Sequence, residues 1–140
     1  MQAAFPHMRE QRYGRIINLC SLNGVNAHVG TLEYNTAKEA LRTATRTAAR
    51  EWAATGIVCN IICPGAKSAS FLRVMGEHPE LLAVADAANP MGRIGDCDDD
   101  VAPVAVFLAS DDCRYVTGNT IYVDGGSHIN GVAWAPDLPD

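Results

Sequence analysis

Tyr34 and Lys38 are four residues apart in a stretch whose pattern predicts a helix over residues 31–55. Residues at this spacing share one face of a helix, so both side chains can reach the same ligand. A tyrosine hydroxyl exchanges protons poorly near neutral pH, because its ordinary pKa is about 10. A neighbouring ammonium favours the phenolate and brings that pKa towards the working range of an enzyme. The pair could therefore act in general acid/base catalysis, with Tyr34 transferring the proton. Taken alone, however, a tyrosine and a lysine at this spacing are more often an ordinary surface contact.

Ser21 directly follows an apolar, β-branched run that predicts a buried strand over residues 15–20. This places its hydroxyl at the carboxyl edge of a sheet, where ligands bind in open α/β proteins. A second apolar run predicts a strand over residues 57–63, ended by Pro64 and Gly65. Because a long helix separates two continuously apolar strands, the pattern predicts a βαβ unit in a parallel sheet that is covered on both faces.

The remaining segments predict further elements around this unit. Thr31 is expected to cap the long helix and Gly56 to end it. The acidic run at residues 98–100 is expected to stabilise the start of a helix rather than to bind a metal. Further helices are predicted over residues 1–11, 70–76, 80–87 and 101–108, a third strand over 119–123, and a C-terminal tail over 127–140.

Composition narrows the class of protein. The 140 residues suit one domain, and a hydrophobic share of 48% excludes a disordered chain. The net charge of −5 argues against a nucleic-acid-binding protein. No apolar run approaches the roughly 18 residues of a membrane span, and the N-terminus lacks a secretory pattern, so we expect a cytoplasmic location. The five cysteines are expected to be reduced, and neither they nor the four histidines have the spacing of a metal site.

Six segments taken together closely resemble the short-chain dehydrogenase/reductase family. The resemblance implies the C-terminal part of a Rossmann-like, doubly wound parallel sheet, with about three strands and their covering helices, which would be incomplete. It covers nearly the whole chain. The segments are GRIINLCS (14–21), YNTAK (34–38), NIICPG (60–65), MGRIG (91–95), VFLAS (106–110) and TGNTIYVDGG (117–126).

The same resemblance implies a function and a role for each residue that matches the family motifs. The activity would be NAD- or NADP-dependent interconversion of an alcohol and a ketone. Tyr34 would be the general acid/base, and Lys38 would lower its pKa and bind the nicotinamide ribose. Ser21 would position the substrate carbonyl, while Pro64 and Gly65 would shape the nicotinamide pocket. Two positions depart from the family pattern, Lys67 and Ala69, and no side-chain role is assigned to either.

The family's glycine-rich, phosphate-binding turn has no counterpart among the twelve glycines. We therefore expect that the chain corresponds to the C-terminal portion only, and that the 140 residues alone bind cofactor weakly and do not turn over. The strand over residues 15–20 would then have an open edge. The alternative is a non-catalytic module that associates with itself or with full-length relatives. The resemblance also implies that the enzyme is a homo-oligomer, a dimer or a tetramer, whose subunits meet through helices 1–11 and 31–55.

Residues 66–95 correspond to the family's substrate lid. Their apolar side chains would cover an apolar substrate or, as the alternative, pack against the sheet. Trp134 and the tail around it are expected to lie on a neighbouring subunit.

Overall fold

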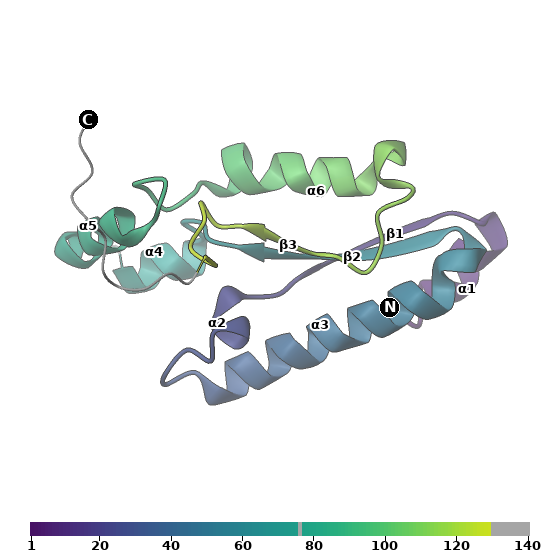
Figure 1. Cartoon of the computed structure of the whole chain (residues 1–140), viewed down its shortest axis with the longest axis horizontal. Coiled ribbons are helices and arrows are strands. Elements are labelled where there is room, and N and C mark those ends of the chain that lie inside the picture. The colour runs from purple at the N-terminus through teal and green to yellow at the C-terminus, as the bar shows by residue number, and fades with distance from the viewer. Residues whose placement is uncertain (76, 130–140) are drawn as a thin grey trace.

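The computed structural model describes residues 1–75 and 77–129, and a sheet of three parallel strands forms its centre (Figure 1). The strands are β1 (Gly14–Leu19), β2 (Ile57–Pro64) and β3 (Thr120–Val123), in the order β1-β2-β3. Gly14 lies opposite Ile57, and Ile61 lies opposite Thr120. The predicted parallel α/β sheet is therefore confirmed, with β1 at one edge of the described sheet, as the sequence led us to expect.

Helices cover both faces of this sheet. Figure 1 shows α3 and α1 against one face and α6 against the other, with α4 and α5 beyond the carboxyl ends of the strands. The bounds are α1 (Phe5–Gln11), α2 (Leu22–Val25), α3 (Leu32–Trp52), α4 (Ala69–Met75), α5 (Pro79–Ala88) and α6 (Ala102–Ala109). Short turns are η1 (Ala53–Thr55), the π-helical η2 (Cys97–Val101) and η3 (Asp111–Cys113).

Strand β2 is the core of the fold because both of its faces are covered. Its residues from Ile57 to Cys63 are all buried. Ile57, Cys59, Ile61 and Cys63 pack on the side of α3, while Ile62 packs with Leu108 of α6. This alternation follows from the two-residue period of a strand, and it explains why the sequence of β2 is continuously apolar.

Buried polar side chains join the elements. Asn18 of β1 donates to Thr45 of α3 at 2.7 Å. Asn60, only 1% exposed, donates from Nδ2 to the Val116 carbonyl at 2.6 Å and accepts from the Asn119 amide at 3.1 Å. These pairs orient α3 and the loop before β3, because a buried amide or hydroxyl without a partner would be costly.

The predicted helix ends agree with the structure in part. Gly56 has φ +84° and follows α3 and η1, where a Cβ would clash with the Arg12 carbonyl. Thr31 precedes α3 as expected, but the capping prediction is wrong in its chemistry. Its Oγ1 lies 3.0 Å from the His28 carbonyl and 2.9 Å from Asn35 Oδ1, and it accepts no helical amide. Local loop hydrogen bonds have replaced the cap.

The acidic run does lie at a helix start. Asp96 precedes η2, and its side chain accepts from the Asp98 and Asp99 amides at 2.7 and 3.1 Å. Most of the predicted tail, including Trp134, lies outside the described residues. Among the residues that are described, no helix combines the length and apolar character needed to cross a membrane.

Candidate active site

Ser21 lies directly beyond the carboxyl end of β1, where Cys20 still bonds to β2 through its amide. Its extended backbone, with φ −154°, makes it the N-cap of the short helix α2. The Ser21 Oγ accepts a hydrogen bond from the Asn23 amide at 3.2 Å. Because the hydroxyl proton is not used in this bond, Ser21 can still donate to a ligand oxygen at the sheet edge.

Lys38 reaches the same edge from α3. Its Nζ donates to the Leu19 carbonyl at 2.8 Å, which leaves two further ammonium protons for other acceptors. The same Nζ lies 5.6 Å from the centre of the Tyr34 ring, one helical turn earlier. Tyr34 is 46% exposed, so its hydroxyl is accessible to a ligand. The structure therefore brings Lys38 beside both the end of β1 and the Tyr34 ring.

Pro64 and Gly65 end β2 at the same edge. The Gly65 amide donates to Val123 of β3 at 2.8 Å, and its carbonyl accepts from Gly95 at 3.0 Å. A Cβ at Gly65 would lie 2.9 Å from the Asp124 Cβ. The glycine is therefore required by the close approach of β3, a packing reason that is independent of any ligand.

The surroundings of Lys38 are mixed in character. Burial raises the pKa of the Cys20 thiol, while the neighbouring Lys38 ammonium acts in the opposite direction. Burial also raises the pKa of the Cys63 thiol to about 11. Arg42, one turn beyond Lys38, is paired with Glu39, whose hydrogen bond raises the pKa of the guanidinium. Lys38 therefore has two buried thiols, Cys20 and Cys63, and the Arg42–Glu39 ion pair in its neighbourhood.

The segment from 66 to 95 leaves the sheet after Gly65 and returns to it at Gly95. Its outgoing and returning ends, which we call its two legs, pair with each other through a bridge between Ala66 and Gly95. Lys67 donates its amide to Gly95 at 2.8 Å. Helices α4 and α5 contact each other. Three of their apolar side chains, Leu72, Leu81 and Val84, are exposed. None of these three belongs to the core clusters. This arrangement favours a cover over the sheet edge rather than packing against the sheet.

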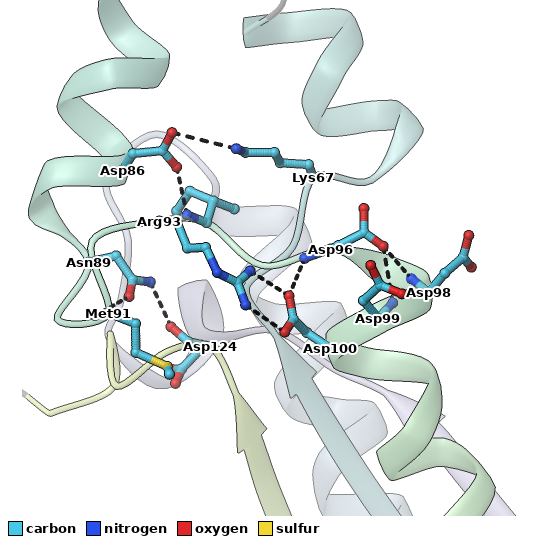
Figure 2. A network of polar contacts seen from close by, with 11 residues as sticks. Lys67, Asp86, Asn89, Met91, Arg93, Asp96, Asp98, Asp99, Asp100 and Asp124 are labelled. Atoms are coloured by element: carbon cyan, nitrogen blue, oxygen red, sulfur yellow. Dashed lines mark hydrogen bonds and ion pairs between the residues drawn. The ribbon is translucent and has the colours of Figure 1, made fainter.

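A polar network that the sequence did not reveal fastens this segment (Figure 2). Asp86 accepts from the Ile94 amide at 2.6 Å and from Lys67 Nζ at 3.5 Å. Arg93 donates two hydrogen bonds to Asp100, at 2.6 and 2.8 Å. The sequence predicts a helix start at the acidic run, and it gives no side-chain role to Lys67, which the structure pairs with Asp86. No spacing rule links the partners, since each pair depends on how the segment folds back.

Two hollows lie near these residues. One of about 320 Å³ lies at the carboxyl ends of β2 and β3, where Gly65, Arg93, Tyr122 and His128 are among its lining residues. A larger groove of about 890 Å³ runs along α3 and includes Thr36, Ala40, Thr43 and Ala44, but neither Tyr34 nor Lys38. The larger hollow is therefore not the predicted site.

The residues at the sheet edge suit the nicotinamide–ribose end of a dinucleotide. A ribose offers hydroxyls, and the free protons of the Lys38 ammonium, with the accessible Tyr34 hydroxyl, are matching partners. In the described part of the chain, β1 leads through Ser21 into the four-residue helix α2. Gly24 in that helix packs against the Asn35 carbonyl and Glu39 rather than forming an open phosphate cradle.

The described chain is a parallel α/β sheet with helices on both faces, and Lys38 is bonded to the carboxyl end of its first strand. Residues 1–128 match a family model described as enoyl-(acyl carrier protein) reductase. The chain belongs to the short-chain dehydrogenase/reductase family.

Known relatives support this assignment. Acetoacetyl-CoA reductase from Rhizobium meliloti is 38% identical over 122 residues, which cover 87% of this chain and 50% of the relative. Gluconate 5-dehydrogenase from Burkholderia cenocepacia, solved with NADP and tartrate, superposes with a TM-score of 0.86 at 32% identity, over 93% of this chain and 51% of that one. An oxidoreductase of the short-chain dehydrogenase/reductase family from Burkholderia thailandensis superposes with a TM-score of 0.84 at 32% identity, over 92% of this chain and 50% of that one. The chain thus spans about half the length of the relatives it matches.

Proposed function

We propose that residues 1–140 form the catalytic portion of a single Rossmann-like domain in an NAD- or NADP-dependent oxidoreductase that interconverts an alcohol and a ketone. The observation that carries this proposal is the position of Lys38. Its ammonium is held at the end of β1 by the Leu19 carbonyl and lies 5.6 Å from the Tyr34 ring. A fixed positive charge beside a phenol is the arrangement that proton transfer by tyrosine needs.

Each residue then has a distinct task. The Tyr34 Oη donates its proton to the substrate oxygen during reduction and takes it back during oxidation. Lys38 stabilises the negative charge that proton transfer leaves on the Tyr34 Oη, and it donates to the ribose hydroxyls. Ser21 donates its hydroxyl proton to the substrate carbonyl and so orients it, while Pro64 and Gly65 bound the nicotinamide pocket. The bound cofactor supplies or accepts the hydride.

The substrate is expected to carry an apolar part next to its carbonyl group. Helices α4 and α5 lie beyond the carboxyl ends of the strands (Figure 1). Their exposed apolar side chains Leu72, Leu81 and Val84 are available to cover such a group. Relatives named as reductases of acetoacetyl-CoA and dehydrogenases of hydroxysteroids are compatible with this choice.

Replacement of Tyr34 by Phe tests the proposal, because it removes the proton donor and leaves the ring in place. Measured in a protein that joins this segment to a phosphate-binding part, turnover should fall roughly 10²–10⁴-fold, the usual contribution of general acid/base catalysis. Cofactor affinity, measured by fluorescence, should fall much less, because Tyr34 is one of several groups that meet the cofactor. Tyr115→Phe is the matched control, since Tyr115 is 99% exposed on a distant turn. Full activity of Tyr34→Phe would contradict the proposal.

We further infer that the protein forms a homo-oligomer through α1 and α3. The α3 face that is turned away from the sheet carries small exposed residues, including Thr36, Ala40, Thr43 and Ala44. Small residues let a second helix approach closely. Thr45, Ala48 and Ala49, by contrast, face the sheet and are buried.

A further inference from the structure

The lid, which we define as residues 66–95, is joined to the rest of the fold at its base by a few side chains. Asp86 binds both legs of the lid, and Arg93 ties the returning leg to Asp100 at the start of η2 (Figure 2). These bonds hold the lid to itself and to the helix that follows. A third side chain, that of Asn89, joins the lid to the turn that follows β3.

Asn89 is the residue that ends α5, and only 4% of its surface is exposed. Its Nδ2 donates to the Asp124 carbonyl at 2.8 Å and to Ser127 Oγ at 2.9 Å. Its Oδ1 accepts from the Met91 amide at 2.9 Å. One side chain therefore bonds at the same time to the returning leg of the lid and to the turn that follows β3.

The turn after β3 is shaped to receive this side chain. Gly125 has φ +64°, and a Cβ at that position would clash with Asn89 Oδ1. Asp124 itself is buried and also holds the Gly126 amide and the His128 ring through its carboxylate, at 3.0 and 2.9 Å. The turn is thus held by hydrogen bonds of its own, and Asn89 lies in close contact with it at Gly125.

We propose that Asn89 is a positioning residue that couples the lid to the turn after β3 and so sets where the lid stands over the carboxyl edge of the sheet. The proposal rests on the proposed function in one respect, since it takes the lid to cover the substrate. Asn89 does not touch the reacting atoms. Its loss should therefore weaken substrate capture and leave the chemical step intact, because an interaction made equally in the ground and transition states affects KM rather than kcat.

The test compares Asn89→Ala, which removes three hydrogen bonds, with Ser127→Ala, which removes one of them. Asn89→Ala should raise KM for the ketone or alcohol substrate about fivefold to tenfold, the effect of losing about one net hydrogen bond, with kcat changed less than about twofold. Ser127→Ala should have a smaller effect, and that effect should vanish when Asn89 is already alanine. Asn119→Ala is the matched control, because its exposed side chain bonds only to the Thr117 carbonyl at the opposite end of β3.

Hydrogen exchange on the same variants gives a readout that does not need activity. In Asn89→Ala, amide exchange should become faster from residue 77 to 95 and at residues 125–127, while the amides of β1, β2 and α3 keep their protection. Faster exchange throughout the chain, or no change in the lid, would overturn the proposal. If a protein that joins this segment to a phosphate-binding part shows no oxidoreductase activity, the proposed function fails, and the exchange result alone still decides whether Asn89 couples the two segments.

Discussion

Lys38 donates a hydrogen bond of 2.8 Å from its Nζ to the backbone carbonyl of Leu19, the last residue of β1. This bond joins the first third of α3 to the end of the edge strand, two residues before Ser21. It also holds the ammonium beside the Tyr34 ring. The two halves of the candidate site, one on a helix and one at a strand end, are therefore joined by one side chain.

The first prediction concerns this link. Lys38→Met keeps the length of the side chain but removes the charge, so both turnover and cofactor affinity should fall, measured by steady-state rates and by fluorescence titration. Lys38→Arg keeps the charge but presents a planar fork in place of a compact ammonium, and it should restore only part of the activity. Equal activity of Lys38→Met and the wild type would show that the ammonium has no catalytic task.

The second prediction concerns the amide of Asn60 in the core. Asn60→Ala removes the bond to the Val116 carbonyl, which keeps a longer contact with the Cys113 thiol at 3.6 Å, and removes the acceptor of the Asn119 amide. The free energy of unfolding should therefore fall by about 1–3 kcal/mol. Urea denaturation followed by circular dichroism measures this loss. Thr47→Ala is the control, because Thr47 is exposed on α3, and its stability should stay within about 0.5 kcal/mol of the wild type.

The third prediction concerns the reactivity of the cysteines. All five are free, and Cys97 alone among them is exposed. Burial raises the pKa of the Cys59 and Cys63 thiols to about 11, so their thiolate fraction at pH 8 is about one in a thousand. A disulfide reagent should therefore titrate one thiol rapidly in the folded protein and all five after denaturation. Cys97→Ser should abolish the rapid phase, and a remaining rapid phase would mean that a buried strand opens readily.

The fourth prediction concerns acid stability. Hydrogen bonds from Arg93, together with that from the Asp96 amide, hold the pKa of the Asp100 carboxyl well below its usual range. A pKa that is lower in the folded state gives stabilisation that is complete above the unfolded value of about 4 and is lost as the pH falls through the folded value. Asp100→Asn should therefore flatten the dependence of unfolding free energy on pH below about pH 4.

Arg93→Met provides the matched comparison for that experiment, because it removes the main cause of the low Asp100 pKa. It should flatten the same part of the curve, and the double variant should add little to either single change. Thermal unfolding at several pH values measures all three. An unchanged slope in Asp100→Asn would mean that the pair contributes nothing to the folded state.

The fifth prediction concerns assembly. A large charged side chain on the small-residue face of α3 should prevent a second helix from approaching, so Ala44→Arg should lower the molar mass measured by light scattering. Ala54→Arg adds the same charge at an exposed position on η1 and should leave the mass unchanged. A wild-type protein that is monomeric at every concentration would contradict this proposal.

Much of the fold could be predicted from local patterns. The continuous apolar run of β2, the helical spacing of α3 and the turn residues Gly56 and Pro64 place their elements within a few residues of the observed bounds. Tyr34 and Lys38 could be singled out for the same reason, because residues four apart on a helix must share a face. These features depend on neighbours in sequence, so the sequence alone was enough.

Other features depend on which segments the parallel crossovers bring together. Thr31 was expected to cap α3, but the loop at His28 competes for its hydroxyl. Asn89 meets the Asp124 carbonyl across 35 positions, and Lys38 meets Leu19 across 19, at a strand end that only the folded sheet places beside the helix. Sequence periodicity and propensity indicate which face of an element is buried. A hydrogen bond, in contrast, needs donor and acceptor positions accurate to a few tenths of an ångström. Tertiary packing alone sets atomic positions with that accuracy.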